Sequence, residues 1–167
     1  LVGSTDVLLA AITEPAGTSE LRGPYAYILD WDSPYKGIFS QSSPTFAFTR
    51  QADAFEAVNS YYHIDTYMRY LNETLGVVVM PYQYSTGVAF DPSGWNGADN
   101  SSYSSSTGRL TFGEGGVDDA EDNAAVVKRV IKDMADGTGG SLKTIVTAAD
   151  AAYKALNRLT SAGGTIP

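Results

Sequence analysis

Residues 96–122 read NGADNSSYSSSTGRLTFGEGGVDDAED, and the elements on either side can be placed relative to this stretch. Its first half is rich in Ser, Asn, Asp and Gly, and it continues a polar loop that we place over 84–108. Arg109-Leu110-Thr111-Phe112 then predicts a short strand, and Gly113-Glu114-Gly115-Gly116 ends it. The carboxylates of Asp118-Asp119 are typical of a helix N-terminus. The stretch therefore predicts a strand that leads into a helix.

Upstream, hydrophobic periodicity predicts one long helix over 53–75. Its apolar positions are Phe55, Val58, Tyr62, Met68, Leu71 and Leu75. Gly76 follows the last of them, where glycine commonly ends a helix. The run from Val77 to Tyr82 predicts a strand, and residues 1–50 contain shorter strand-type runs that Pro and Gly separate.

Downstream, two amphipathic helices are expected over 118–136 and 141–159, with Ser141 as the N-cap of the second. The chain therefore reads as one α+β domain over residues 1–167. We expect a twisted, mainly antiparallel sheet with one long helix, built from a β-rich segment over 1–50 and from the strands and polar loop of 77–116. The two final helices complete this prediction.

Composition excludes several classes of function. The chain carries 11 Lys and Arg against 19 Asp and Glu, which gives a net charge of −8. Such a surface repels phosphate backbones and argues against a nucleic-acid partner. No cysteine is present, so disulfides and thiolate metal sites are excluded. The aliphatic runs Val7–Ile12 and Val77–Met80 are far shorter than the roughly 20 residues of a membrane helix. Abundant Tyr, Ser, Thr, Gly and Asn with few Lys favour a secreted, extracellular protein.

Several stretches together resemble the N-terminal lobe of thermolysin-like and fungalysin-like zinc metallopeptidases, the gluzincins. They are residues 96–122, Ala57–Asp65, Arg69-Tyr70-Leu71 and Leu75-Gly76. In this family such a strand leads into a helix bearing His-Glu-x-x-His, and a second helix supplies a glutamate as the third zinc ligand. The resemblance implies that the two final helices occupy the positions of the active-site helices, and that the family's helical C-terminal lobe is absent.

The chain departs from the family where zinc would bind. Lys128 and Lys132 stand at the two histidine positions, Arg129 at the position of the general-base glutamate, and Ala148 at that of the third ligand. Ammonium and guanidinium groups have no lone pair to give a metal, whereas catalytic zinc needs imidazole or carboxylate ligands. Without the metal and the base, no water is activated for peptide hydrolysis. We therefore expect no bound zinc and no catalytic residue.

Two other groups are candidate binding residues. Asn100, Ser101 and Tyr103 lie at the family's edge strand, where the position of Asn100 contacts substrate backbone in active relatives, and here this strand is expected to pair with a peptide. Calcium is the second candidate ligand, because carboxylate oxygens bind it well. Its acidic residues are Glu114, Asp118, Asp119, Glu121 and Asp122. The alternative for this cluster is a solvated helix start. Asn72-Glu73-Thr74 and Asn100-Ser101-Ser102 match the acceptor pattern for N-glycosylation.

The favoured function is a non-catalytic extracellular module that binds protein or peptide, or that has a structural role and self-assembles. Without the C-terminal lobe, one face of the final helices would be uncovered, which predicts a homo-oligomer or an assembly with another chain. A second hypothesis is a secreted zinc metalloendopeptidase whose active-site segment is altered or misread in this sequence. A third is a calcium-stabilised adhesive domain.

Overall fold

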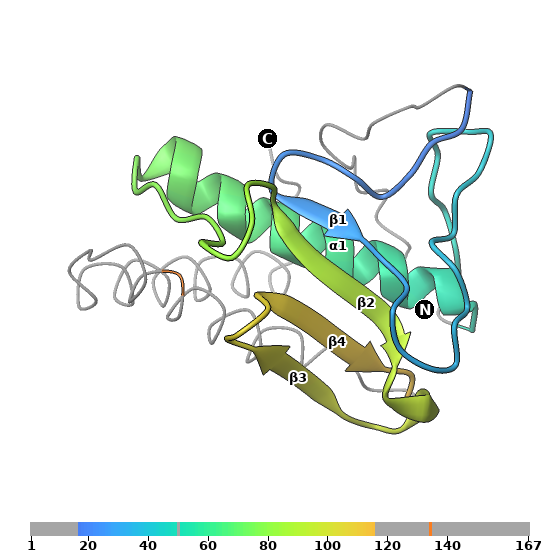
Figure 1. The fold of residues 1–167 in the computed structure, drawn as a ribbon. Coiled ribbons are helices and arrows are strands. Elements are labelled where there is room, and N and C mark those ends of the chain that lie inside the picture. Colours follow the sequence, from blue (N-terminus) through green and yellow to red (C-terminus); the bar gives the residue numbers. More distant parts are fainter. Residues whose placement is uncertain (1–16, 50, 116–133, 135–167) are drawn as a thin grey trace, which may run out of the picture.

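The computed structural model describes residues 17–49, 51–115 and 134, and it is an α+β arrangement of one long helix and a four-stranded mixed sheet. The strands are β1 (Ala26–Ile28), β2 (Val88–Gly94), β3 (Ser101–Ser104) and β4 (Arg109–Gly113). The helical elements are α1 (Asp53–Arg69), the π-helical turn η1 (Tyr70–Thr74) and the 3-10 turn η2 (Trp95–Gly97). The helix α1 lies along the sheet, close to β1 and β2 (Figure 1).

The strands follow the order β1-β2-β4-β3 across the sheet. β1 pairs with β2 and β2 with β4 in parallel, whereas β3 and β4 are antiparallel. The prediction of a mainly antiparallel sheet is therefore wrong. The connection between β1 and β2 contains α1, and a crossover through a helix joins strands that run parallel. The prediction failed because it did not include this crossover. After β2 the chain passes to the sheet edge as β3 and turns back, so that β4 fits between them (Figure 1).

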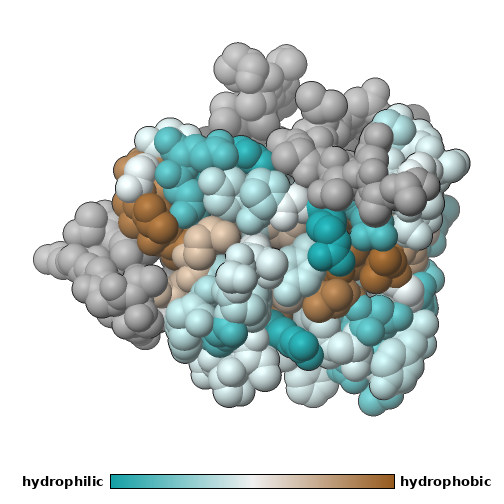
Figure 2. Space-filling model, turned by 45° about the horizontal axis from the view of Figure 1, so that its top comes forward, coloured by the Kyte–Doolittle hydropathy of each residue, from teal (hydrophilic) through white to brown (hydrophobic). Residues whose placement is uncertain are grey.

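The segment Val77–Tyr82 forms no strand, contrary to the prediction. The amide of Asn72 makes the hydrogen bonds to the backbone of Val79 that a neighbouring strand would otherwise make. Its Oδ1 accepts the N–H of Val79 at 2.9 Å, and its Nδ2 donates to the carbonyls of Val79 at 3.0 Å and Met68 at 2.7 Å. Val79 is fully buried, whereas Val78 is 76% exposed. Figure 2 shows a hydrophobic patch on the left of the view, the side on which η1 and this segment lie in Figure 1.

The strands β2 and β3 arise within 84–108, which we predicted to be a polar loop. Every residue of β2 is buried, and Val88 and Phe90 belong to the hydrophobic core. The strand predicted at Arg109–Phe112 is confirmed as β4, and one of the strand-type runs predicted within 1–50 is β1. Within residues 17–49, β1 is the one strand that the structure contains.

The helix predicted over 53–75 is confirmed as α1 and η1. Its apolar stripe agrees with the prediction at Met68 and Leu71, which are buried. In the first half of the helix the stripe differs, because Phe55, Val58 and Tyr62 are only partly buried. The buried residues there are Ala57, Tyr61 and Ile64. Small side chains such as Ala57 let this face approach the sheet closely, and the larger ones fill the space above Ile28, Val88, Phe90, Leu110 and Phe112.

The two final helices, predicted over 118–136 and 141–159, lie outside the described residues apart from Met134. Met134 is fully buried and belongs to the hydrophobic core. In the part of the chain that the structure describes, no helix is long and apolar enough to cross a membrane.

Candidate functional site

The two edges of the sheet differ in what lies beside them. On the outer side of β1, the N–H of Ile28 donates to the carbonyl of Leu21 at 3.0 Å, and the N–H of Gly23 donates to the carbonyl of Ala26 at 2.8 Å. The chain therefore covers this edge with its own backbone. At the other edge, β3 pairs with β4 on one side, and it is the last of the described strands in the sheet order (Figure 1). Edge strands are the usual sites at which a further strand is added.

The backbone N–H and C=O groups of successive β3 residues point alternately toward β4 and away from it, as in any antiparallel pair. Asn100, just before β3, faces β4, because its carbonyl accepts the N–H of Gly113 at 2.7 Å. Ser102 is paired with Thr111 and faces β4 in the same way, which directs the backbone of Ser101 away from β4. The N–H of Ser101 donates to Oδ1 of Asn100 at 2.9 Å. The side chain of Asn100 thus caps an N–H at the outer edge of the sheet.

The side chains of β3 alternate between the two faces of the sheet. Ser101 and Tyr103 are paired with residues of β4 that belong to the core, so they lie on the face that α1 covers. Tyr103 is partly buried and packs against that core. The other two serines of β3 lie on the opposite face. The structure therefore places the three predicted peptide-binding residues together, with Asn100 at the beginning of the strand.

The turn between β3 and β4 is held by three consecutive side chains from the loop before β2. Tyr84 Oη donates to the carbonyl of Gly108 at 2.6 Å, and Gln83 Nε2 donates to the carbonyl of Ser105 at 2.7 Å. Tyr82 Oη donates to the same carbonyl at 3.3 Å. Gly108 has a φ of +68°, and a Cβ there would lie 2.7 Å from Oε1 of Gln83. The turn therefore requires glycine at this position.

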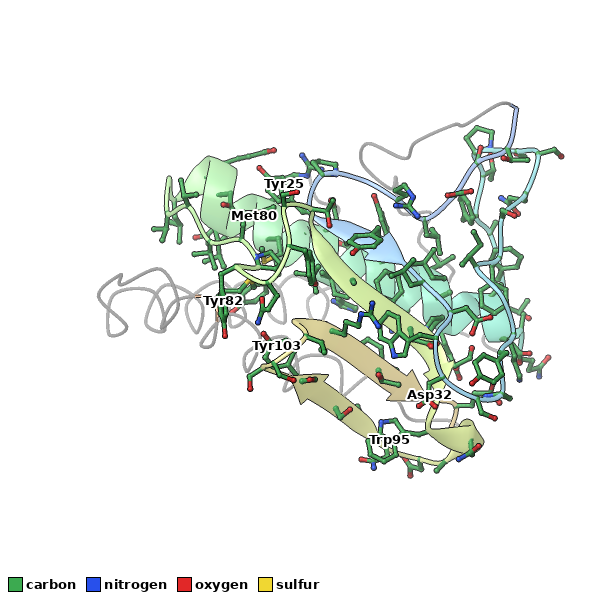
Figure 3. All side chains as sticks on the ribbon, in the orientation of Figure 1. Tyr25, Asp32, Met80, Tyr82, Trp95 and Tyr103 are labelled. Carbon is green, nitrogen blue, oxygen red and sulfur yellow. The ribbon has the colours of Figure 1, made fainter. Side chains whose placement is uncertain are left out.

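Tyr84 also accepts the N–H of Ala89 at 3.0 Å, so its hydroxyl joins the turn to β2. Burial raises the pKa of Tyr84 to about 12, although the Ala89 N–H lowers it. The hydroxyl consequently remains protonated, and able to donate to the turn, well above neutral pH. Figure 3 shows Tyr82 close to Tyr103 at this end of the sheet.

A second set of polar groups lies at the opposite end, where the parallel strands β1 and β2 end. The fully buried Asp91 accepts the N–H groups of Trp31 at 2.8 Å and Asp32 at 2.9 Å through Oδ2, and that of Ser93 at 3.0 Å through Oδ1. Asp32 accepts the N–H of Trp95 at 3.0 Å (Figure 3). Burial is the main cause that raises the pKa of Asp91, against these N–H groups, which lower it. Through Trp31 and Asp32, the carboxylate of Asp91 joins the segment that follows β1 to β2.

Of the acidic residues considered for calcium, Glu114 is the one that the structure describes. Its Oε1 lies 2.7 Å from Nζ of Lys36, which also lies 2.8 Å from Oδ2 of Asp53. The hydrogen bonds to Asp53 and then to Glu114 raise the pKa of Lys36. Lys36 therefore neutralises the charge of Glu114 that calcium would use. Within residues 17–49 and 51–115, no group of three or more His, Cys, Asp or Glu side chains is placed to hold a metal ion.

The other predicted metal positions lie outside the described residues. For calcium they are Asp118, Asp119, Glu121 and Asp122, and for zinc they are Lys128, Arg129, Lys132 and Ala148. Comparison with protein-family models, with curated proteins and with solved structures finds no match to the chain. The resemblance to zinc metallopeptidases therefore rests on the sequence motifs alone.

Sequence reasoning missed the residues that hold this sheet in place, namely Tyr82, Gln83, Tyr84 and Asp91. For Asp91 a signal is present in the sequence. The carboxylate of Asp91 accepts the N–H of Ser93, two residues further along the chain. This spacing is that of an Asx turn. For the other three, nothing in the sequence indicates that they contact a turn more than 20 residues away.

Proposed function

We propose that this chain is a non-catalytic extracellular binding module that takes up an extended peptide as a further strand beside β3. The observation that carries the proposal is the difference between the two sheet edges. The chain's own residues 21–23 cover the outer side of β1, whereas β3 is the last described strand at the other edge. In strand addition, main-chain hydrogen bonds supply affinity and alternate side chains supply specificity.

The hairpin that carries this edge is held before any partner arrives. Tyr82, Gln83 and Tyr84 donate hydrogen bonds to the carbonyls of the β3–β4 turn, with donor–acceptor distances of 2.6 to 3.3 Å. A surface that is ordered in advance loses less conformational entropy on binding. Three of the four β3 side chains are serines, which offer little steric hindrance to a neighbouring backbone. Asn100 would have to release the N–H of Ser101, and its amide would then be available to the incoming peptide.

The two faces of β3 favour a peptide with alternating side chains. Tyr103 packs against the core on the α1 face, so an apolar side chain beside it would extend the buried surface. The serines on the opposite face favour polar neighbours. The net charge of −8 attracts basic flanking residues. The partner is therefore an extended segment of alternating apolar and polar residues with Lys or Arg at its ends.

A peptide titration tests strand addition. The probe is a fluorescein-labelled Lys-Val-Thr-Val-Thr-Val-Lys peptide, and the readout is fluorescence anisotropy with the unglycosylated full chain. Ser101→Pro removes the edge N–H without removing a bond to β4, and it should weaken binding at least about tenfold, which corresponds to one lost main-chain hydrogen bond of roughly 1.4 kcal/mol. Ser101→Ala keeps that N–H and should bind as the natural sequence does.

Two controls make the peptide result specific. N-methylation of one alternate set of peptide nitrogens should abolish binding, and methylation of the other set should leave it unchanged, because a strand pairs through one edge only. Equal affinity for the Ser101→Pro and Ser101→Ala variants would refute strand addition at β3. Sedimentation velocity of the chain alone shows whether a second copy occupies the edge in place of the peptide.

The non-catalytic part of the proposal is supported by Lys128, Arg129 and Lys132, which cannot bind or activate zinc. The full chain, incubated with zinc and casein, should leave casein intact and should retain no stoichiometric zinc after dialysis. Peptide mapping by mass spectrometry across residues 120–160 checks these side chains directly. Recovery of His-Glu-x-x-His in this region would support the metalloendopeptidase hypothesis instead.

A further inference from the structure

The structure distinguishes the two N-glycosylation triplets, which are equivalent in sequence. Asn72 belongs to η1, and its Nδ2 is the atom to which a sugar would be joined. That nitrogen donates to the carbonyls of Met68 at 2.7 Å and Val79 at 3.0 Å. The linked nitrogen of a glycosylated asparagine keeps a single hydrogen, and a sugar attached here would collide with the two backbone segments. The folded chain is therefore incompatible with a glycan on Asn72.

Asn100 is in the opposite situation. It is exposed, and it lies in the connection between η2 and β3. Its Oδ1 accepts the N–H of Ser101 at 2.9 Å, and its Nδ2 donates no hydrogen bond to any residue that the structure describes. Glycosylation leaves Oδ1 unchanged as an acceptor, so the cap on Ser101 survives the modification. Ser102 supplies the hydroxyl that the triplet requires at its third position.

We propose that Asn100 is an N-glycosylation site and that Asn72 is not one. The co-substrate is an oligosaccharide linked to a lipid pyrophosphate. Nδ2 of Asn100 forms a bond to the anomeric carbon of the first sugar, and the bond from that carbon to the pyrophosphate oxygen breaks. The lipid pyrophosphate leaves with the bonding electrons, and Nδ2 gives up one proton to a base of the transferring enzyme. The site requires export of the chain through a compartment that carries out this transfer.

This inference rests on the extracellular location in the proposed function, but it does not depend on peptide binding. A glycan on Asn100 would lie at the beginning of β3, where it would add polar bulk beside Ser101. The peptide titration above uses unglycosylated protein, so its failure would leave the glycan assignment untouched. Conversely, absence of the glycan would leave the peptide result unchanged.

The test uses the full chain secreted from eukaryotic cells behind a cleavable leader, followed by peptide mapping with and without peptide N-glycosidase. We expect one occupied site, at Asn100, which the glycosidase converts to aspartate. Occupancy should be lost in Asn100→Gln and in Ser102→Ala. It should be retained in the matched variant Ser101→Ala, which preserves the triplet, and in Thr74→Ala, which destroys the other one.

Circular dichroism of the secreted protein confirms that each variant is folded. If Asn100→Gln or Ser102→Ala is not secreted, the other of the two is sufficient for the test. An unmodified Asn100 in folded, secreted protein would overturn the proposal. A glycan on Asn72 in folded protein would overturn it equally, because the amide nitrogen of Asn72 donates two hydrogen bonds in the folded chain.

Discussion

Replacement of Asn72 by alanine removes three hydrogen bonds, two to Val79 in the segment that follows η1 and one to the carbonyl of Met68 in α1. Each such bond contributes about 1 kcal/mol net. Val79 is fully buried, so water cannot replace the partners that its N–H and carbonyl lose. We therefore expect Asn72→Ala to lower the free energy of unfolding by about 3 kcal/mol. For a chain of this size, the midpoint of thermal unfolding should fall by about 6 to 12 °C.

Urea denaturation measures this loss as a shift of the midpoint at an unchanged slope. Asn72→Asp should be at least as destabilising, because it keeps the acceptor for the Val79 N–H but directs a carboxylate oxygen at the carbonyls of Met68 and Val79. Thr74→Ala alters the same triplet without touching these bonds, and it should change stability by less than about 0.5 kcal/mol. A loss of under about 1 kcal/mol for Asn72→Ala would refute the reasoning. Hydrogen exchange should locate the effect at the amide of Val79.

Three further variants test other contacts. Gly108→Ala should destabilise the fold by about 2 kcal/mol, measured by urea denaturation. Alanine is strained at a φ of +68°, and its Cβ would collide with the side chain of Gln83. A stability within 0.5 kcal/mol of the natural chain, at roughly the error of such measurements, would contradict it. The pKa of Tyr84 is about 12 in the folded protein against 10.0 ordinarily, so its protonated hydroxyl contributes stability below pH 10 that is lost as the pH rises through about 12. The natural chain should therefore lose up to about 3 kcal/mol more than Tyr84→Phe over this interval, and parallel pH profiles would exclude the effect. Arg69→Met leaves the buried carboxylate of Asp65 without the guanidinium 3.2 Å away, and we expect a loss of about 2 kcal/mol. Glu73→Gln, at the exposed partner of the same arginine, is the control and should cost less than about 0.5 kcal/mol.

The long helix could be predicted because its signals are local. Apolar residues recur at helical spacing, and Gly76, with a φ of +65°, ends the helical region as the sequence indicates. Met68 and Leu71 were predicted to face the core and are buried. In the first half of the helix the buried face could not be predicted, since Tyr61 and Tyr62 are equally suited to a core. The choice depends on the sheet that packs against the helix, and tertiary packing decides it in favour of Tyr61, which is fully buried.

The strands were harder to predict, because pairing outweighed local preference. β2 contains Asp91, Pro92 and Gly94, which normally interrupt strands. β3 consists of three serines and one tyrosine, and its pairing with β4 makes it a strand. Ser101–Ser104 is the last of the described strands in the sheet order. Binding of a peptide there remains a prediction, and the contacts that hold the hairpin could not be inferred from sequence, because they join residues far apart in the chain.

Val77–Met80 has a strand-forming composition, yet it lies outside the sheet. Its backbone is held at Val79 by the amide of Asn72 and at Val77 by the carbonyl of Leu71, 2.9 Å away. Short segments of β-branched residues without charge are the sequences that seed cross-β aggregates once they are released. Opening of the Asn72 contacts would present such a segment to neighbouring molecules while the rest of the domain stays folded. The solubility of this protein in concentrated solution therefore depends on Asn72 more than its contribution to global stability would suggest.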